Sequence, residues 1–344
     1  MPSYQQIREI HDNTERVRIV DRILALRAQL DRDIPAKTAT ETLLLATWNI
    51  RDFGNNRRGE SLHYMAEIIS RFDLVAVQEV ARDLGGLKKL VDFLGHNWDY
   101  IVTDSTEGTS GGGERMAFIY DRCKVFFRKV AGELVLQQTR LIQDKLQFAR
   151  TPFSVAFQAG WFKFMLTTVH MYYGSNVKED PRRVAEIAAV ARFLRERSLK
   201  EDENNILLGD FNIFKTSDKT MMAMINEGFY IPQAIREHPT DLGKTKYYDQ
   251  IAFRLKLQSD MTVFSEGDQR AGAFNFAETV YTPQDLGAYR GFFDEKNTKD
   301  KTEEEVMKYY LSTWRTFQMS DHLPLWIELK VDFSNQYLKG IRWD

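Results

Sequence analysis

The apolar positions near the start of the chain predict one amphipathic helix over residues 3–32. The residues that recur at the 3.6-residue helical period, followed by two that widen the apolar face, are Ile19, Ile23, Leu26 and Leu30, then Val20 and Leu24. Pro35 and the threonines after it end the pattern. We therefore expect residues 1–40 to form an N-terminal helical extension. It either packs on the main body, which we favour, or serves as an arm that binds a protein partner; the sequence identifies no such partner.

From Leu43 onward, short apolar runs alternate with stretches of helical periodicity. The runs that predict strands span residues 43–48, 74–78, 99–103, 115–120, 124–129, 153–158, 162–169, 206–209, 249–255 and 324–330. Helical patterns span about 62–72, 84–94, 181–198 and 218–227. Strands mixed with helices in this way predict a body built from layers of sheet and helix.

Residues 258–315 form the least regular part of the chain. They are polar and rich in Gly, Asp and Thr, with one predicted helix that begins at Thr302 and whose capping box Glu305 completes. A stretch of that length inside a domain is usually a functional lid or an insertion. We predict one or the other here, within a main domain that spans residues 41–344.

Composition narrows the classes of protein that fit. The 344 residues can bury a large core without disulfides. The 47 basic and 49 acidic side chains nearly balance, so any surface that binds a polyanion must be local. The single Cys123 excludes an intramolecular disulfide and a four-cysteine zinc site. Because no signal-peptide pattern and no membrane-length apolar run occurs, we expect a cytoplasmic protein that does not bind membranes.

Polar side chains stand directly at the ends of the predicted strands and in the loops beside them. They are Asn49, Glu79, Glu114, His170, Asp210, Asn212, Asp249, Asp321 and His322. Loops held by a rigid sheet are where active sites are commonly built. Any one of these residues alone is more often a solvated loop residue or a structural histidine. Their joint occurrence beside apolar strands argues against coincidence.

The residue types favour metal-assisted hydrolysis of a phosphate ester. Those that offer only oxygen ligands are Asn49, Glu79, Asp210, Asn212 and Asp321. Mg²⁺ and Mn²⁺ prefer such ligands, whereas zinc would draw more His or Cys. His170 and His322 have side chains that transfer protons near neutral pH. Glu114 and Asp249 remain to orient them, so the set suits in-line attack of water on a phosphate.

An ordered series of motifs resembles the endonuclease/exonuclease/phosphatase superfamily, and deoxyribonuclease I in particular. The motifs are T-W-N-I (47–50), V-Q-E-V (77–80), G-E-R-M-A-F-I-Y (113–120), A-R-T-P-F (149–153), T-V-H (168–170), G-D-F-N (209–212), Y-D-Q-I (248–251) and S-D-H-L-P (320–324). The match covers about residues 43–331, and its strength lies in the whole set rather than in any one motif. It implies an α+β fold, a four-layer αββα sandwich in which two mostly antiparallel sheets pack face to face with helices outside.

The resemblance also implies roles for the polar residues. It implies Mg²⁺, for which Mn²⁺ may substitute, held mainly by Glu79 with Asn49 and Asp321 nearby. It implies that Asp210 orients the attacking water and that Asn212 binds a phosphate oxygen or a metal-bound water.

The proton-transfer pairs follow from the same resemblance. His322 is expected to pair with Asp249, and His170 with Glu114 as in deoxyribonuclease I. Arg150 resembles a phosphate-contacting arginine, whose fixed fork of donors suits that role. Its alternative is a surface salt bridge.

Three departures limit the resemblance. Secreted deoxyribonuclease I relies on disulfides, which Cys123 alone cannot form. Ala81 stands where a basic DNA contact is expected, and Gly112 where an aromatic one is. The minor-groove grip of that enzyme is therefore not expected here.

Basic residues close to the strand ends could form a local rim that holds a phosphate backbone. They are Arg51, Arg57 and Arg58 after Asn49, Lys215 after Asn212, and Lys244 and Lys246 before Asp249. Of these we assign Arg51 to substrate phosphate. Aromatic residues expected nearby, which could stack bases, are Tyr172, Tyr173, Phe214 and Trp314. The alternatives are scattered surface charge and core aromatics.

Three functional hypotheses follow. The leading one is a Mg²⁺-dependent phosphodiesterase that acts on nucleic acid, as a DNA endonuclease or exonuclease. The second is a phosphatase or phospholipid phosphodiesterase that uses the same centre on a small substrate, because loops rather than the fold choose substrates. The third, a binding module with an inactive site, is disfavoured because every expected catalytic residue type is present.

Overall fold

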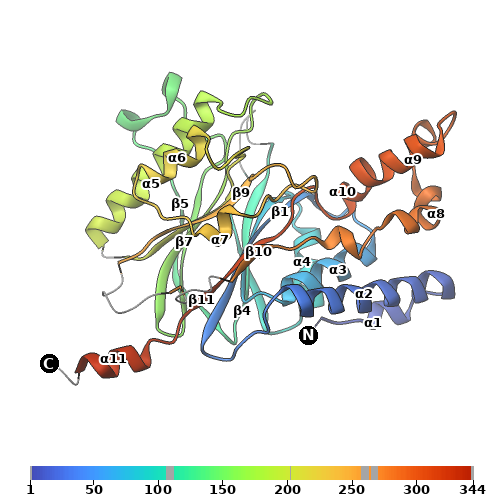
Figure 1. Cartoon of the computed structure of the whole chain (residues 1–344), viewed down its shortest axis with the longest axis horizontal. Helices are drawn as coiled ribbons and strands as arrows, with labels where there is room; N and C mark the ends of the chain where they lie inside the picture. The colour runs from blue at the N-terminus through green and yellow to red at the C-terminus, as the bar shows by residue number, and fades with distance from the viewer. Residues whose placement is uncertain (1, 106–111, 202, 257–262, 265–269, 342–344) are drawn as a thin grey trace.

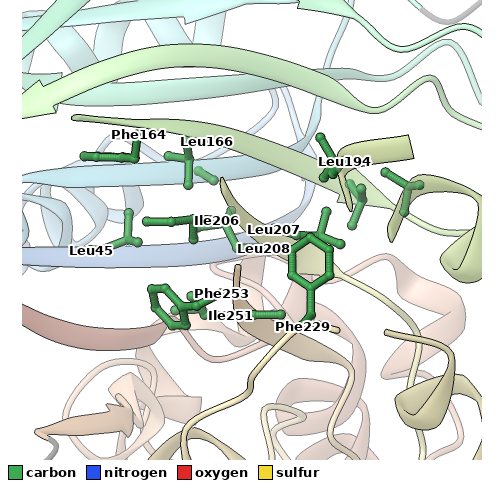
Figure 2. Packing of buried hydrophobic residues seen from close by; sticks show 14 of the residues in the cluster. Leu45, Phe164, Leu166, Leu194, Ile206, Leu207, Leu208, Phe229, Ile251 and Phe253 are labelled. Atoms are coloured by element: carbon green, nitrogen blue, oxygen red, sulfur yellow. The ribbon is translucent and has the colours of Figure 1, made fainter. Parts of the chain in front are cut away.

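The central strand of the molecule, β1 (Thr42–Phe53), is buried on both faces. In the computed structural model, which describes residues 2–105, 112–201, 203–256, 263–264 and 270–341, Leu43 and Leu45 belong to the core between two sheets. Leu44 and Ala46 belong to a second core under the outer helices. Figure 2 shows Leu45 beside Ile206 of the opposite sheet. Alternating side chains of one strand therefore join two hydrophobic cores.

Two sheets pack face to face. One has six strands in the order β10 (Ala271–Ala273), β11 (Leu325–Lys330), β1, β2 (Leu74–Val80), β4 (Arg115–Asp121) and β3 (Trp98–Val102). The other has five, in the order β5 (Val125–Glu133), β6 (Phe153–Ala159), β7 (Phe162–His170), β8 (Asn205–Asp210) and β9 (Asp249–Arg254). The pairs β1–β2 and β7–β8 are parallel and the other pairs antiparallel.

Helices cover both outer faces (Figure 1). On the five-stranded side lie α5 (Pro181–Glu201) and α6 (Lys219–Ile225), and on the six-stranded side α2 (Asn13–Asp33), α3 (Gly59–Ser70) and α4 (Gly85–Leu94). The remaining short helices are α1 (Gln5–Arg8), α7 (Gln233–Arg236), α8 (Leu286–Tyr289), α9 (Glu303–Tyr309), α10 (Arg315–Gln318), α11 (Ser334–Ile341), the π turn Tyr310–Trp314 and the 3₁₀ turns Gln138–Arg140, Gln143–Lys145, Phe276–Glu278, Pro283–Asp285, Arg290–Phe292 and Glu295–Asn297. The predicted four-layer α+β sandwich is confirmed. Among the described helices, none has the length and apolar character that crossing a bilayer requires.

The prediction of one helix over residues 3–32 was wrong. The chain leaves the helical conformation between α1 and α2, because Asp12 caps α2 by accepting the backbone N–H groups of Thr14 at 2.7 Å and Glu15 at 3.0 Å. The apolar face is also narrower than predicted, since Leu24 is 57% exposed. Within the described residues, α2 packs on α3 and adds its regularly spaced apolar side chains to the outer core.

Much of the segment predicted to be irregular folds into short helices beside α2 (Figure 1). The expected capping box of Thr302 and Glu305 is present. The side chains that pack together in this helical region are Tyr281, Tyr289, Phe293, Tyr310 and Trp314. Trp314 is buried among them, which is the core role weighed as the alternative to stacking bases. Residues 257–262 and 265–269 of the predicted lid or insertion lie outside the described residues, and its role stays a prediction.

Candidate active site

The sheet topology brings the predicted site residues to one edge of the sandwich. The parallel pairs β1–β2 and β7–β8 each end at a common edge, where their antiparallel neighbours β4 and β9 begin. In the second sheet, His170 is therefore the register partner of Asp210, and Asp210 is the register partner of Asp249. Contacts among Asn49, Glu79, His170, Asp210 and His322 bring residues distant in the sequence into a single site.

Asp210 lies at the centre of this site. Its Oδ2 is 3.0 Å from Asn49 Nδ2, 3.5 Å from His170 Nε2 and 3.9 Å from His322 Nε2. Its Oδ1 accepts the backbone N–H of Asn212 at 2.8 Å. One buried carboxylate oxygen is thus flanked by two imidazoles and an amide, while the other oxygen is held by the backbone.

His322 is oriented by a fully buried carboxylate. Its Nδ1 is 2.8 Å from Asp249 Oδ2, and its ring stacks on Tyr248 with the ring centroids 5.3 Å apart. Burial lowers the pKa of His322, but the charges of Asp249 and Asp210 outweigh it and hold that pKa well above its usual value. The raised pKa favours the protonated form of His322, whose Nε2 lies 3.9 Å from Asp210 Oδ2.

His170 belongs to a different arrangement. Its Nδ1 is 2.9 Å from Glu114 Oε2, and the guanidinium fork of Arg150 grips the same carboxylate at 2.7 and 2.9 Å. Burial raises the pKa of Glu114, but His170 and Arg150 together reverse this and lower it to about 2. Arg150 therefore forms an ion pair within the site rather than on the surface, and its contact with phosphate stays a prediction.

Asn49 and Glu79 have the chemistry of a hard-cation site. Asn49 Nδ2 donates to Glu79 Oε1 at 3.0 Å, as it does to Asp210, which fixes the direction of the amide. The amide oxygen of Asn49 is buried and has no hydrogen-bond partner among the residues that the structure describes. A buried acceptor without a partner beside a carboxylate suits a bound cation.

A second group of possible metal ligands is formed by Asp210, Asp249 and His322, whose ligand atoms lie within 4.8 Å of one another. In that group, however, His322 Nδ1 already bonds to Asp249. Both groups leave a buried oxygen without a hydrogen-bond partner among the described residues, Asn49 Oδ1 in one and Asp249 Oδ1 in the other. Asn49 and Glu79 fit an added cation better because neither would have to give up a hydrogen bond to a histidine ring.

Asp321 and Arg51 lie at the solvent side of the site. Asp321 is 47% exposed and its Oδ2 is 3.7 Å from a terminal nitrogen of Arg51. The same nitrogen of Arg51 donates to Thr316 Oγ1 at 2.8 Å, and the guanidinium lies 4.0 Å from the ring centroid of Phe317. The structure thus places both residues next to Asn49, with their predicted roles untested.

The predicted basic rim is smaller than expected. Arg57 donates to the backbone carbonyls of Phe317 and Met319, and Arg58 pairs with Glu60 and Glu15. These two guanidinium groups are therefore used in contacts within the protein and do not contribute to the predicted rim.

Other members of the predicted rim stay close to solvent. Lys215 and Lys244 are exposed, whereas Lys246 lies 3.6 Å from the ring centroid of Phe214. Phe214 itself is buried and Tyr173 is exposed, so of this pair only Tyr173 offers an open ring.

Part of the backbone strain among the described residues lies at the site. Glu79, Asn212 and Asp52 adopt φ angles of 61°, 53° and 46°, a left-handed conformation that costs a non-glycine residue about 1–3 kcal/mol. The N–H of Asp52 donates to Glu79 Oε2 at 2.9 Å, which holds that carboxylate. Before Asp210, a Cβ on Gly209 would lie 2.2 Å from the carbonyl oxygen of Val169, so only glycine lets β7 and β8 approach there.

Several supporting residues were not assigned a role from the sequence. Ser320 Oγ donates to the carbonyl of Asn49 at 2.6 Å and accepts the N–H of His322 at 3.0 Å, which joins the two segments. Buried Arg183 donates to the carbonyls of Tyr173 and Lys178. Ser320 is the first residue of the S-D-H-L-P motif, so the sequence offered a signal for it. Nothing in the sequence pattern marks Arg183.

Comparisons with known proteins agree with this geometry. The model of the Endonuclease/Exonuclease/phosphatase family matches residues 46–285. No curated protein sequence matches the chain.

Solved structures show the same fold at low identity. A mannosyl-6-phosphatase from Bacteroides thetaiotaomicron is 18% identical with a TM-score of 0.54, and 83% of this chain and 99% of that one are covered. The human Nocturnin catalytic domain, solved with a sulfate anion, is 13% identical with a TM-score of 0.53, covering 84% and 94%. TDP2 from D. rerio, in complex with a single-strand DNA product, is 13% identical with a TM-score of 0.50, covering 84% and 98%.

The family match covers well over half of the chain, and the residues that carried the resemblance meet in one site. The chain therefore belongs to the endonuclease/exonuclease/phosphatase family of enzymes that hydrolyse phosphoester bonds.

Proposed function

We propose that the protein is a Mg²⁺-dependent phosphodiesterase that hydrolyses nucleic acid, with DNA as its substrate. The observation that carries the proposal is the convergence of His170 Nε2 and His322 Nε2 on one oxygen of Asp210. Two imidazoles and one carboxylate at this spacing suit a phosphate group together with an attacking water.

The chain's own residues divide the work. Asp210, whose Oδ1 is held by the Asn212 N–H, orients the attacking water through Oδ2. Protonated His322 donates to a phosphate oxygen and stabilises the charge that develops there. His170, held by Glu114, lies on the other side of Asp210 and is positioned for the leaving oxygen.

Two further groups complete the phosphate site. Arg150 keeps one terminal nitrogen that does not contact Glu114, and we assign that nitrogen to the phosphate. Asn212 donates its side-chain amide to the carbonyl of Met171 at 2.9 Å, which orients the side chain so that its remaining N–H can meet a phosphate oxygen.

Glu79 and the free amide oxygen of Asn49 would hold the cation, with Asp321 nearby. When bound, a divalent cation supplies charge stabilisation at the phosphate oxygens and lowers the pKa of water. Mn²⁺ accepts the same oxygen ligands and is expected to substitute.

The choice of nucleic acid rests on the surroundings of the site. Lys215 and the open ring of Tyr173 lie on loops that follow site residues, and such groups suit a backbone and a base. Lys244 precedes Asp249 and is exposed, although its Nζ lies 3.9 Å from Glu278. The complex of the neighbour TDP2 with single-strand DNA shows that the fold can accept such a polymer.

The second candidate is hydrolysis of a small phosphoester. The observation that favours it is the internal use of Arg57 and Arg58, which leaves fewer cations for a long phosphate backbone. The mannosyl-6-phosphatase among the structural neighbours shows that the fold also serves small substrates.

The experiment uses purified full-length protein with plasmid DNA, single-stranded DNA and a panel of phosphomonoesters, each with Mg²⁺ or Mn²⁺. We expect DNA cleavage that requires metal and is lost in His322→Ala. His96→Ala, which changes an exposed histidine between α4 and β3, is the matched control and should cleave normally. Release of phosphate from monoesters with DNA intact would replace the leading proposal by the second candidate. Inactivity toward all of these substrates would contradict both.

A further inference from the structure

The helix α5 carries a buried carboxylate that belongs to none of the roles above. Glu186 is fully buried, and its Oε1 accepts the backbone N–H of Ala149 at 3.0 Å. Its Oε2 accepts the backbone N–H of Tyr172 at 3.1 Å. Arg182, one turn earlier on the helix, supplies the balancing charge with Nε 3.1 Å from Oε1.

Both of these backbone groups lie next to site residues. Ala149 immediately precedes Arg150, whose guanidinium grips Glu114. Tyr172 follows His170 by two residues, just beyond the end of β7. One carboxylate therefore joins the two chain segments that carry Arg150 and His170.

These two segments need an external support. Residues 149 and 150 lie outside any strand or helix, and Tyr172 lies beyond the last paired residue of β7. A catalytic group must be held within about 0.5 Å of its productive position. Backbone bonds to a carboxylate are charge-assisted and so roughly twice as strong as neutral ones, which suits this purpose.

We propose that Glu186 is a positioning residue, which fixes Arg150 and His170 relative to each other so that both meet the same phosphate. This inference rests on the proposed function of the site, and it assigns a role to a residue that touches neither substrate nor metal. The consequence is that α5, an outer helix, sets the geometry on the Glu114 side of the site.

The test is Glu186→Gln in the full chain. Glutamine has one acceptor oxygen in place of two, so either Ala149 or Tyr172 loses its bond. With bis(4-nitrophenyl) phosphate and Mn²⁺ we expect kcat to fall about 10- to 100-fold and KM to change less than about threefold, because alignment rather than binding is lost.

Two variants serve as controls. Glu227→Gln also removes a buried carboxylate, one that pairs with Arg192 and Arg195 away from the site. This variant should retain at least about half of the activity. Arg182→Gln removes the balancing charge but leaves both backbone bonds, and its kcat should stay within about threefold of wild type.

A double-mutant cycle separates positioning from a loss of folded protein. In an Arg150→Ala background, Glu186→Gln should cost less than about threefold in kcat, because one of the two groups whose relative position it fixes is already gone. An equal fold-loss in both backgrounds would overturn the proposal, as would unchanged kcat in the single variant.

Amide hydrogen exchange gives a measurement that does not depend on activity. Glu186→Gln should speed exchange in peptides covering 147–150 and 171–173, with residues 190–201 of α5 unchanged. If wild type hydrolyses no phosphoester, the proposed function fails, while this exchange still decides whether Glu186 holds the two segments. Unchanged exchange at both segments would refute that structural role.

Discussion

The two carboxylate–histidine pairs on either side of Asp210 are built differently. The Asp249–His322 pair is closed, since Asp249 is fully buried and one ring nitrogen faces it at 2.8 Å. In the Glu114–His170 pair the carboxylate is partly exposed and is shared with Arg150. Among the described basic side chains, Asp249 thus pairs with His322 alone, whereas Glu114 pairs with both His170 and Arg150.

Electrostatics follows this difference. Burial of His322 lowers the pKa of its imidazole, but the charges of Asp249 and Asp210 outweigh this and raise it, which favours a proton on the histidine of the closed pair. In the shared pair, burial raises the pKa of Glu114, but His170 and Arg150 outweigh this and lower it to about 2. We infer that the closed pair supplies a fixed donor, whereas the shared pair supplies an ordered group of charges.

The largest expected effect comes from the closed pair. His322→Ala should lower kcat by about 10³-fold, since it removes a proton donor and leaves Asp249 buried without its partner. His170→Ala should cost about tenfold less, because the ion pair of Glu114 with Arg150 remains. Steady-state kinetics with matched thermal-unfolding measurements checks this order, and equal losses would mean that the two pairs are equivalent.

The carboxylates should follow the same order. Asp249→Asn should lower kcat about 100-fold or more, because an amide cannot stabilise the protonated ring of His322. Glu114→Gln should lower it about tenfold, since the pairing of β7 with β8 still restrains His170. Single-turnover rates for the two variants compare them directly, and a larger loss in Glu114→Gln would reverse our assignment.

Metal dependence tests the region between the pairs. Removal of divalent ions with a chelator should abolish hydrolysis, and added Mg²⁺ should restore it. Asn49→Ala should raise the Mg²⁺ concentration for half-maximal rate by about 10- to 100-fold, because it removes the free amide oxygen. A titration that is unchanged in Asn49→Ala but shifted in Asp249→Asn would place the cation in the other ligand group.

The smallest effect concerns stability against pH. The pKa of Glu114 is about 2 in the folded protein, against about 4.5 in the unfolded chain. The ionised carboxylate therefore stabilises the fold above pH 4.5 by up to about 3 kcal/mol, and this contribution is lost as the pH falls toward 2. Glu114→Gln should therefore lower the free energy of unfolding at pH 6 and flatten its decline below pH 4.5. Urea unfolding at several pH values measures this, and parallel curves for both proteins would contradict it.

The sequence predicted the strands and the site because both depend on local pattern and on motif order. Apolar runs that end in a polar residue, as at Glu79 and Asp210, mark the strand ends correctly. The resemblance supplied the pairing of His322 with Asp249, 73 residues apart, which no periodicity could give. The roles of the individual site residues stay predictions.

What the sequence missed depends on long-range packing. The uses of Arg57 and Glu186 are visible only once backbone groups distant in sequence lie beside them. Because Arg57 follows Asn49 closely in the sequence, it was predicted to be a cation of the rim. In the structure its guanidinium donates to a backbone carbonyl instead. The helical region over 276–318 was underestimated because its order comes from contacts between aromatic side chains, which the polar composition concealed.

A crystal structure with Mn²⁺ and phosphate, using anomalous scattering to locate the ion, tests the central claim most directly. We predict a Mn²⁺ ion bound to Glu79 and to the amide oxygen of Asn49. We also predict a phosphate whose oxygens contact both His170 and His322. An ion held by Asp210, Asp249 and His322, or a phosphate that neither imidazole reaches, would contradict the account.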